Sequence, residues 1–363
     1  MSWAIWVTGR PGSGKSTIVR ATAACLVERG TPVTVLELDQ IRRVVTPTPT
    51  YSHAEREIVY RALVFMAVTL TEAGVPVLID ATAHRRAWRA LARASIRRFA
   101  EVQLDCSLDV ARLRERTRPR GEAPAGIYAR AGRPGATVPG VDVTYETSPA
   151  AELTIDTAAE DPATAAERVT ALAQRLAGSA PAPAGGDGAV IWITGPPGSG
   201  KTTLAQRLAE ALVGDRVAVT VLEWVALRAL VFRDGAPSEA DEDIAHRALA
   251  YTAKLLADAG RTVIVDATAP RRAWRALART LAGAFAEVQL VCPPETCLER
   301  ERAVRWGRQP LPRATSAAPD FAVEYEYSLS PDLLLDTATR SEWTACEDLL
   351  RLARRLARRR LAG

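Results

Sequence analysis

The sequence is short of the features that mark secreted and membrane proteins. Its 363 residues include five cysteines and three histidines, and none of them forms a CxxC pair or another metal-ligand spacing. The odd number of cysteines and their apolar surroundings predict reduced, buried thiols. No apolar run reaches the roughly eighteen residues that span a bilayer. The first residues lead into a glycine-rich loop with no basic segment or cleavage site. We therefore expect a soluble, cytoplasmic protein without a membrane partner.

Positively charged residues are only slightly in excess of negatively charged ones. Lys and Arg number 47 against 42 Asp and Glu, which gives a net charge of +5 at pH 7, and arginine supplies nearly all of the positive charge. A polyanion could explain this excess, but so could arginines placed around the phosphates of a nucleotide. The charge alone therefore does not decide between these explanations, and we do not expect nucleic acid as a partner.

One sequence pattern occurs twice along the chain. Residues 7–17 (VTGRPGSGKST) recur as residues 193–203 (ITGPPGSGKTT), so that Gly195 stands 195 − 9 = 186 residues after Gly9. The same offset holds without a gap as far as residues 101–104 (EVQL), which recur at 287–290. A two-copy repeat of this length indicates a domain duplication and not a solenoid.

The two copies are separated by GSAPAPAGGDG at residues 178–188. Proline and glycine without apolar periodicity indicate a flexible linker. We therefore divide the chain into a first P-loop kinase domain (1–177), the linker (178–188) and a second, divergent P-loop kinase-like domain (189–363). A homodimer and an intramolecular pairing of the two domains are both compatible with this organisation.

Strand and helix patterns alternate within each copy. In the first copy, apolar or β-branched runs at 4–8, 33–38 and 75–80 indicate buried strands, and residues 16–29 and 54–73 have helical spacing. This alternation predicts an α/β fold, with two tandem P-loop NTPase domains that each contain a mostly parallel sheet covered by helices on both faces.

Both copies carry the motif GxxxxGK[ST] between a strand and a helix. The glycines allow successive backbone N–H groups to converge on a phosphate, and the helix N-terminus adds positive potential. Lys15 would bridge the β- and γ-phosphates of ATP and Ser16 would ligate Mg²⁺, with Lys201 and Thr202 in the same roles in the second copy. The predicted ATP-binding residues are Gly9, Arg10, Pro11, Gly12, Ser13, Gly14, Lys15, Ser16, Thr17, Gly195, Pro196, Pro197, Gly198, Ser199, Gly200, Lys201, Thr202 and Thr203.

Two aspartates follow strands of the first copy. Asp39 could accept the proton of an attacking hydroxyl or help to hold Mg²⁺, because ligands bind at the carboxyl ends of parallel strands. Asp80 ends the run VLID at 77–80, which has the form of a Walker B strand. Capping of the next helix is the alternative for both aspartates. With Lys15, they are the predicted catalytic residues.

Arginines supply the candidates for binding an anionic substrate. Arg42, Arg56 and Arg61 could clamp it, and a solvated helix face is the alternative for each. An arginine-rich segment at 112–133 would suit a lid that closes over ATP, although a solvated basic helix explains most of its members. The arginines of this segment are Arg112, Arg114, Arg116, Arg118, Arg120, Arg130 and Arg133.

On these residues the first copy resembles the adenylylsulfate (APS) kinases, which phosphorylate the 3′-hydroxyl of adenosine 5′-phosphosulfate. Residues 36–42 (LELDQIR) resemble the family's LDGDNVR, 51–56 (YSHAER) resemble FSxxDR, and 126–131 (GIYARA) resemble GLYxxAR. The resemblance covers residues 3–157 and implies that Asp39 is catalytic. It also implies that Asp39, Arg42, Tyr51 and Arg56 bind the substrate, a small nucleotide-like anion such as adenylyl sulfate.

The chain departs from the family at several positions. Residues 81–84 (ATAH) replace ISPF, and Val138 stands where the family has the Phe of an adenine sandwich. In the second copy Val225 replaces Asp39 and Glu242 replaces Arg56. We therefore expect the first domain to transfer the γ-phosphoryl group of ATP, most directly to the 3′-hydroxyl of adenylyl sulfate. The alternatives are another hydroxyl acceptor (a nucleoside, sugar, antibiotic or polynucleotide 5′-end) and a nucleotide-dependent regulatory ATPase.

Overall fold

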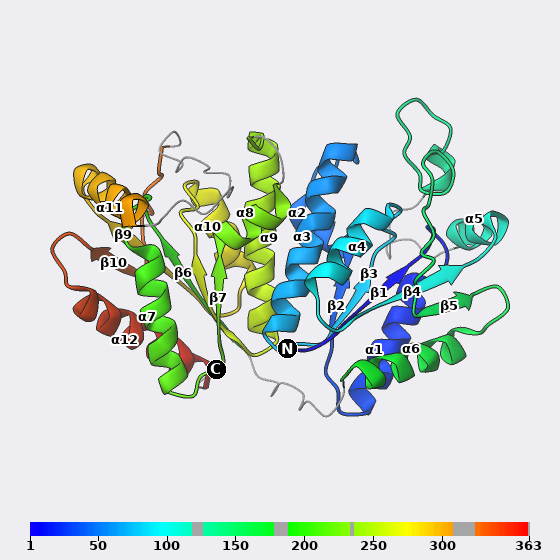
Figure 1. Cartoon of the computed structure of the whole chain (residues 1–363), viewed down its shortest axis with the longest axis horizontal. Coiled ribbons are helices and arrows are strands. Elements are labelled where there is room, and N and C mark those ends of the chain that lie inside the picture. Colours follow the sequence, from blue (N-terminus) through cyan, green and yellow to red (C-terminus); the bar gives the residue numbers. More distant parts are fainter. Residues whose placement is uncertain (118–125, 178–187, 233–235, 308–323, 362–363) are drawn as a thin grey trace. The chain divides into compact units, whose positions relative to one another are not determined.

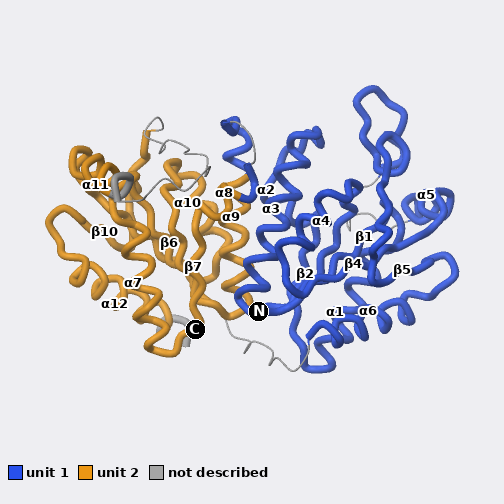
Figure 2. The backbone as a smooth tube through the Cα atoms, in the orientation of Figure 1, with its two compact units in different colours: residues 1–185, 230–244 blue, residues 186–229, 245–363 orange. Residues whose placement is uncertain are grey.

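The computed structural model describes residues 1–117, 126–177, 188–232, 236–307 and 324–361. The chain divides into two compact units, one of Met1–Gly185 with Leu230–Ile244 and one of Gly186–Ala229 with Ala245–Gly363 (Figure 2). Nearly all of the predicted linker lies outside the described residues. No described helix is both long and apolar enough to cross a membrane.

In the first unit, the described strands form a five-stranded sheet in the order β2-β3-β1-β4-β5, and every neighbouring pair is parallel (Figure 1). The strands are β1 (Ala4–Thr8), β2 (Thr34–Glu37), β3 (Val77–Asp80), β4 (Phe99–Asp105) and β5 (Leu153–Asp156). The helices are α1 (Lys15–Glu28), α2 (Leu38–Val45), α3 (His53–Glu72), α4 (Arg86–Ser95), α5 (Leu108–Thr117) and α6 (Pro162–Ala177), with a short 3-10 helix η1 (Tyr128–Arg130).

Strand β1 shows why both faces of this sheet are covered. All five of its residues are buried, and successive side chains of a strand point to opposite faces. Ile5 and Val7 join the apolar cluster formed with α1 and α6. Trp6 points the other way, stacks at 6.5 Å on Tyr60 of α3, and donates through its indole N–H to the carbonyl of Ala81 at 3.0 Å. An apolar run without polar alternation therefore forms a strand with two buried faces.

The second unit repeats this arrangement. Its described strands are in the order β7-β8-β6-β9-β10, again parallel throughout. The strands are β6 (Ala189–Thr194), β7 (Val219–Glu223), β8 (Thr262–Asp266), β9 (Phe285–Val291) and β10 (Leu333–Asp336). The helices of the second copy are α7 (Lys201–Gly214), α8 (Trp224–Val231), α9 (Glu239–Asp258), α10 (Arg272–Leu281), α11 (Pro294–Gly307) and α12 (Glu342–Leu361). The end of α8 and the start of α9 fall within Leu230–Ile244 and so are grouped with the first unit.

The predicted α/β class and the parallel sheets are confirmed, and the structure adds two features. Strand β2 ends at Glu37 and passes directly into α2, so two helices, not one, lie between the second and third strands. A fifth strand, β5, pairs with β4 at the edge of the sheet. Because β2, β3 and β1 are neighbours, the glycine loop after β1, the start of α2 and the last residue of β3 meet at one end of the sheet.

Candidate active site

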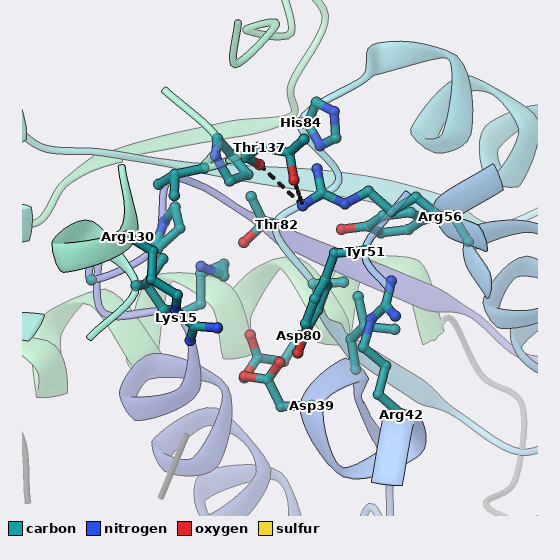
Figure 3. A pocket seen from close by; sticks show the side chains of 18 of the residues that line it. Lys15, Asp39, Arg42, Tyr51, Arg56, Asp80, Thr82, His84, Arg130 and Thr137 are labelled. Carbon is teal, nitrogen blue, oxygen red and sulfur yellow. Dashed lines mark hydrogen bonds between the residues drawn. The ribbon is translucent and has the colours of Figure 1, made fainter. Parts of the chain in front are cut away.

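A cavity of about 290 Å³ opens at the carboxyl ends of β1, β2 and β3 in the first unit (Figure 3). It is lined by residues that are far apart in the sequence, from the glycine loop, both ends of α2, the start of α3 and the segment that follows η1. Of the predicted catalytic and substrate residues, the cavity brings together Lys15, Asp39, Arg42, Tyr51, Arg56 and Asp80, along with the predicted metal ligand Ser16.

The glycine loop has the conformation that phosphate binding requires. Gly12 and Gly14 have φ of 78° and 93°, in the left-handed region. A Cβ atom on Gly12 would lie 2.3 Å from the carbonyl oxygen of Ala111, so no side chain fits there. Lys15 begins α1, and its ammonium donates to the carbonyls of Gly9 at 3.1 Å and Arg10 at 3.0 Å. The loop therefore presents the N-terminus of α1 and an ammonium group to the cavity.

Two carboxylates face each other beside this loop (Figure 3). Asp39 is in the first turn of α2, and Asp80 is the last residue of β3. Burial raises the pKa of Asp80, and the negative charge of Asp39 raises it further, whereas the charge of Lys15 and a hydrogen bond from Ser16 lower it. Two neighbouring carboxylates, one of them buried, favour a bound cation.

This set of residues fits a magnesium ion. The described residues contain no group of three or more His, Cys, Asp or Glu that could hold a metal ion by themselves. Mg²⁺ in nucleotide sites is held by one or two carboxylates together with substrate phosphates and water. The hydroxyl of Ser16 and the carboxylates of Asp80 and Asp39 have the right chemistry for that site.

Glu55 organises the side of the cavity opposite the glycine loop. Its carboxylate accepts hydrogen bonds from Arg42 Nη1 at 2.7 Å, from the Thr50 hydroxyl at 2.7 Å and from the backbone N–H of Tyr51 at 3.3 Å. Tyr51 has φ of 55°, which is uncommon for a residue with a side chain. The Arg42 guanidinium lies 5.1 Å from the centre of the Tyr51 ring. Glu55 thus fixes the Tyr51 ring in the cavity wall.

Arg56 is the strongest candidate for an anion ligand. Its Nη2 donates to the hydroxyl of Thr137 at 2.7 Å and to the carbonyl of the same residue at 3.0 Å (Figure 3). None of the described residues forms an ion pair with Arg56. Burial lowers the pKa of its guanidinium, and the positive charge of Arg42 lowers it further. A half-buried cation of this kind is stabilised when an anion enters the cavity.

His84 and Thr82 complete the wall next to Arg56. The imidazole of His84 meets the ring of Trp88 edge-on at 5.0 Å, and Trp88 is buried and stacks on Tyr60 at 4.0 Å. Burial, together with the positive charge of Arg56, lowers the pKa of His84 to about 4. The imidazole is therefore neutral at pH 7 and offers one donor and one acceptor.

The remaining predicted arginines divide between the cavity and other roles. Arg130 of η1 lines the cavity, and the neighbouring Tyr128 donates its hydroxyl to the carbonyl of Pro11 at 2.7 Å. Arg114 binds the carbonyl of Thr157 at 2.6 Å and is a structural residue. Arg118 and Arg120 lie outside the described residues.

Arg61 does not line the cavity, although we predicted it as a substrate ligand. Its guanidinium pairs with Glu57 at 2.6 Å, one turn earlier on α3, and the arginine side chain is 7% exposed. A position on the same helix as Arg56 suggested a shared role. Five residues correspond to about 500° of helical rotation, however, so the two side chains point in different directions.

Glu55, which supports the cavity wall, and the lining residues His84 and Thr137 were not singled out from the sequence. Glu55 directly precedes Arg56 in residues 51–56 (YSHAER), a segment that resembles a family motif, and this position was the available signal for it. His84 looked unexceptional, although it directly follows the strand that ends in Asp80. Thr137 offered no local signal, because its contact with Arg56 joins residues 81 positions apart.

The second unit contains the same loop at the end of β6. Lys201 begins α7, and its ammonium donates to the carbonyl of Pro196 at 2.9 Å. The hydroxyl of Thr202, predicted as a metal ligand, donates to Asp266 Oδ2 at 2.6 Å.

A parallel sheet with a glycine loop, a loop lysine, a Walker B aspartate and an adjoining anion pocket defines an ATP-dependent kinase of the P-loop class. The particular family follows from comparison with known proteins. The profile of the family described as adenylylsulphate kinase matches residues 1–156 and 187–306, and the chain belongs to this family, with two copies in tandem.

Each of the relatives matches about one of the two copies in this chain. The probable adenylyl-sulfate kinase of Archaeoglobus fulgidus is 35% identical over 164 residues, which cover 44% of this chain and 99% of the relative. The adenylyl-sulfate kinase of Pseudomonas aeruginosa is 33% identical over 169 residues, 46% of this chain and 82% of the relative. Among solved structures, the Mycobacterium tuberculosis APS kinase CysC in complex with AMPPNP and APS is 29% identical, with a TM-score of 0.38, and the match covers 46% of this chain and 97% of that one.

Proposed function

We propose that the first domain transfers the γ-phosphoryl group of ATP to the 3′-hydroxyl of adenylyl sulfate. The observation that carries the proposal is one cavity that is lined both by the phosphate loop and Asp80 and by Asp39, Tyr51 and Arg56. A donor site and an acceptor site in one cavity are what direct phosphoryl transfer requires. The adenylyl-sulfate kinase names of the relatives support this choice of acceptor.

On the donor side, the chain binds and orients the triphosphate. The N–H groups of the glycine loop and the ammonium of Lys15 would neutralise the charge that develops on the β–γ bridging oxygen as it becomes the leaving group. Ser16 and Asp80 would hold Mg²⁺, which supplies further neutralisation of the phosphates when it is bound. Buried Asp80 accepts that role because a divalent cation compensates for its desolvation.

On the acceptor side, Asp39 is placed to receive the proton of the attacking hydroxyl. The hydroxyl oxygen forms a bond to the γ-phosphorus, the bond from that phosphorus to the bridging oxygen breaks, ADP leaves, and the hydroxyl proton passes to the carboxylate. Arg56 would bind the anionic group of the acceptor and Tyr51 would stack on its base. Arg42 lines the cavity but is neutralised by Glu55, so we assign it to the support of Tyr51.

A coupled assay of ADP release tests this proposal. The full chain with ATP and Mg²⁺ is offered adenylyl sulfate, AMP, adenosine, a hexose and a 5′-hydroxyl oligonucleotide. We expect adenylyl sulfate to give a kcat/KM at least about tenfold above the others, because only it combines an adenine, a free 3′-hydroxyl and the phosphosulfate anion. Faster turnover with the hexose or the oligonucleotide would contradict the proposed acceptor. ADP release at an equal rate without any acceptor would favour a regulatory ATPase.

A further inference from the structure

The donor half of the site is preserved in the second unit. Gly198 and Gly200 have φ of 76° and 91°, close to the values of their counterparts in the first loop. A Cβ atom on Gly198 would lie 2.4 Å from the carbonyl oxygen of Cys297, so this glycine is held in the same way as Gly12. The carboxylate of Asp266, at the end of β8, accepts a hydrogen bond from Thr202 at 2.6 Å.

Two buried polar side chains of this loop lack the partners that a filled site would give them. The Lys201 residue is 9% exposed, and among the described residues its ammonium donates to a single carbonyl, that of Pro196. The Ser199 hydroxyl is fully buried within the loop and has no hydrogen-bond partner in the described part of the chain. An ammonium group has three donors. The loop is therefore arranged around an anion.

The acceptor half of the second unit contains a buried stack of aromatic side chains. The rings of Trp224, His246 and Trp274 form a continuous stack, with centres 3.9 Å apart for the first pair and 3.8 Å for the second. All three residues are buried, at 8%, 3% and 3% exposure. At the offset of 186 residues, Trp224 and His246 correspond to Leu38 and Tyr60, both of which line the cavity of the first unit. The first unit has the His246–Trp274 pair of this stack as Tyr60 on Trp88, and the second unit adds the Trp224 indole, which is larger than the leucine side chain at the same position.

The groups that act on the acceptor are also replaced. Val225, at the position of Asp39, is 72% exposed and offers no proton acceptor. In the sequence, Pro237 and Glu242 stand at the positions of Tyr51 and Arg56. A glutamate in place of the anion-binding arginine would repel an anionic acceptor.

We propose that the second domain binds a nucleoside triphosphate with a divalent cation at residues 195–203 and does not transfer its phosphoryl group. It is a nucleotide-holding domain, in which Lys201, Thr202 and Asp266 perform the donor-side functions and the Trp224–His246–Trp274 stack closes the acceptor side. This inference concerns a different site from the one proposed above, and it does not depend on which acceptor the first domain uses.

The scarcity of lysine permits a direct test, because the chain contains Lys15, Lys201 and Lys254 and no other lysine. An acyl phosphate of ATP transfers its acyl group to an amine held beside the phosphates, forms an amide and releases ATP. The full chain is treated with this reagent and Mg²⁺, with or without excess ATP, and the labelled peptides are quantified by mass spectrometry. Lys254, on α9 and paired with Asp258, serves as the internal control.

We expect ATP-protectable labelling of both Lys15 and Lys201, at least about tenfold above Lys254. The Lys15→Ala chain should still label Lys201 and should lose about two to three decades of phosphoryl transfer to any acceptor that the wild type uses. Absent or unprotected labelling of Lys201 in a chain that labels Lys15 would overturn the binding half of the proposal. Wild-type transfer by Lys15→Ala would overturn the non-transferring half. Folding of each variant is checked by the labelling of the remaining loop lysine.

Discussion

The guanidinium of Arg42 and the carboxylate of Glu55 form an ion pair that is almost completely removed from solvent. Their Nη1 and Oε1 atoms are 2.7 Å apart, and each side chain is 8% exposed. The pair connects the end of α2 to the first turn of α3, and Glu55 also accepts the backbone N–H of Tyr51. A single carboxylate therefore determines the shape of the acceptor side of the cavity.

Replacement of Glu55 by Gln should destabilise this region. The amide keeps the shape but leaves the Arg42 cation buried without a compensating charge, which costs about 1–3 kcal/mol. We expect a lower melting temperature and a higher KM for the acceptor, with a smaller change in the KM for ATP. Glu167→Gln is the matched control, since Glu167 pairs with Arg29 in an exposed position and such pairs contribute about 0–1 kcal/mol. Equal melting temperatures for the two variants would contradict the structural role of Glu55.

The same comparison has a predictable pH dependence. Burial alone would raise the pKa of Glu55, but hydrogen bonds from Thr50 and the pairing with Arg42 outweigh it and hold that pKa below its ordinary value of 4.5. A carboxyl whose pKa is lowered by folding contributes stability above its unfolded pKa and loses it as the pH falls through the folded pKa. The stability difference between wild type and Glu55→Gln should therefore be constant from pH 6 to 8 and should shrink below about pH 4.5. A difference that grew on acidification would contradict the sign of this shift.

Removal of the Arg56 cation should raise the KM for the acceptor and leave the KM for ATP nearly unchanged. A hydrogen bond between charged groups contributes about 1.5–3 kcal/mol, so Arg56→Ala should raise the acceptor KM by about 10- to 100-fold. Arg56→Lys should recover only part of the loss, because an ammonium cannot bind both Thr137 and an anion in the geometry of a guanidinium. Arg93→Ala, which removes an arginine paired with Glu152 outside the cavity, is the control. Steady-state kinetics with both substrates varied would separate the two KM values.

Asp39→Asn separates catalysis from a purely structural role. If Asp39 receives the hydroxyl proton, the amide should lower kcat by about 10²–10⁴ and leave the affinity for ATP nearly unchanged. The N-cap of α2 is Glu37 and not Asp39, so a structural Asp39 contributes only the attraction of its charge to the helix N-terminus, and the amide would then keep almost full turnover. Rapid-quench measurement of a single turnover distinguishes the two cases. A variant with wild-type turnover would exclude Asp39 from the chemistry.

A pair of glycine substitutions tests the phosphate loop by geometry alone. Gly12 and Gly74 both have positive φ, 78° and 86°, so alanine strains the backbone at either site by about 1–2 kcal/mol. Only at Gly12 would the new Cβ collide with a neighbouring carbonyl, whereas at Gly74 nothing lies within 4 Å. We expect Gly12→Ala to lower the affinity of the first site for ATP by at least about tenfold, measured by titration. Gly74→Ala should lower only the melting temperature.

The residues predicted for the donor side lie together in the cavity, and their signals in the sequence are local. The loop motif, the strand before it and the helix after it occupy adjacent positions, and the Walker B strand ends in its aspartate. The start of α2 was harder to predict, since Leu38 continues an apolar strand pattern although it is the first residue of the helix.

The acceptor side depends on contacts that no short segment encodes. The pairing of Arg42 with Glu55 spans thirteen positions and the contact of Arg56 with Thr137 spans 81. Arg61 shows the converse, because it is close to a motif in the sequence, yet its side chain pairs with Glu57 and does not line the cavity. The stack of Trp224 on His246 likewise arises from two separate substitutions that become neighbours only in the folded chain.

Transfer of ³²P from [γ-³²P]ATP to adenylyl sulfate tests the central claim most directly. The product is separated by chromatography for the wild type, Lys15→Ala and Lys201→Ala. Electrostatic stabilisation of the transferring group by one residue is worth about two to three decades in rate. We predict labelled 3′-phosphoadenylyl sulfate from the wild type, a loss of that size for Lys15→Ala, and a much smaller loss for Lys201→Ala. A larger loss for Lys201→Ala, or no labelled nucleotide from the wild type, would contradict the account.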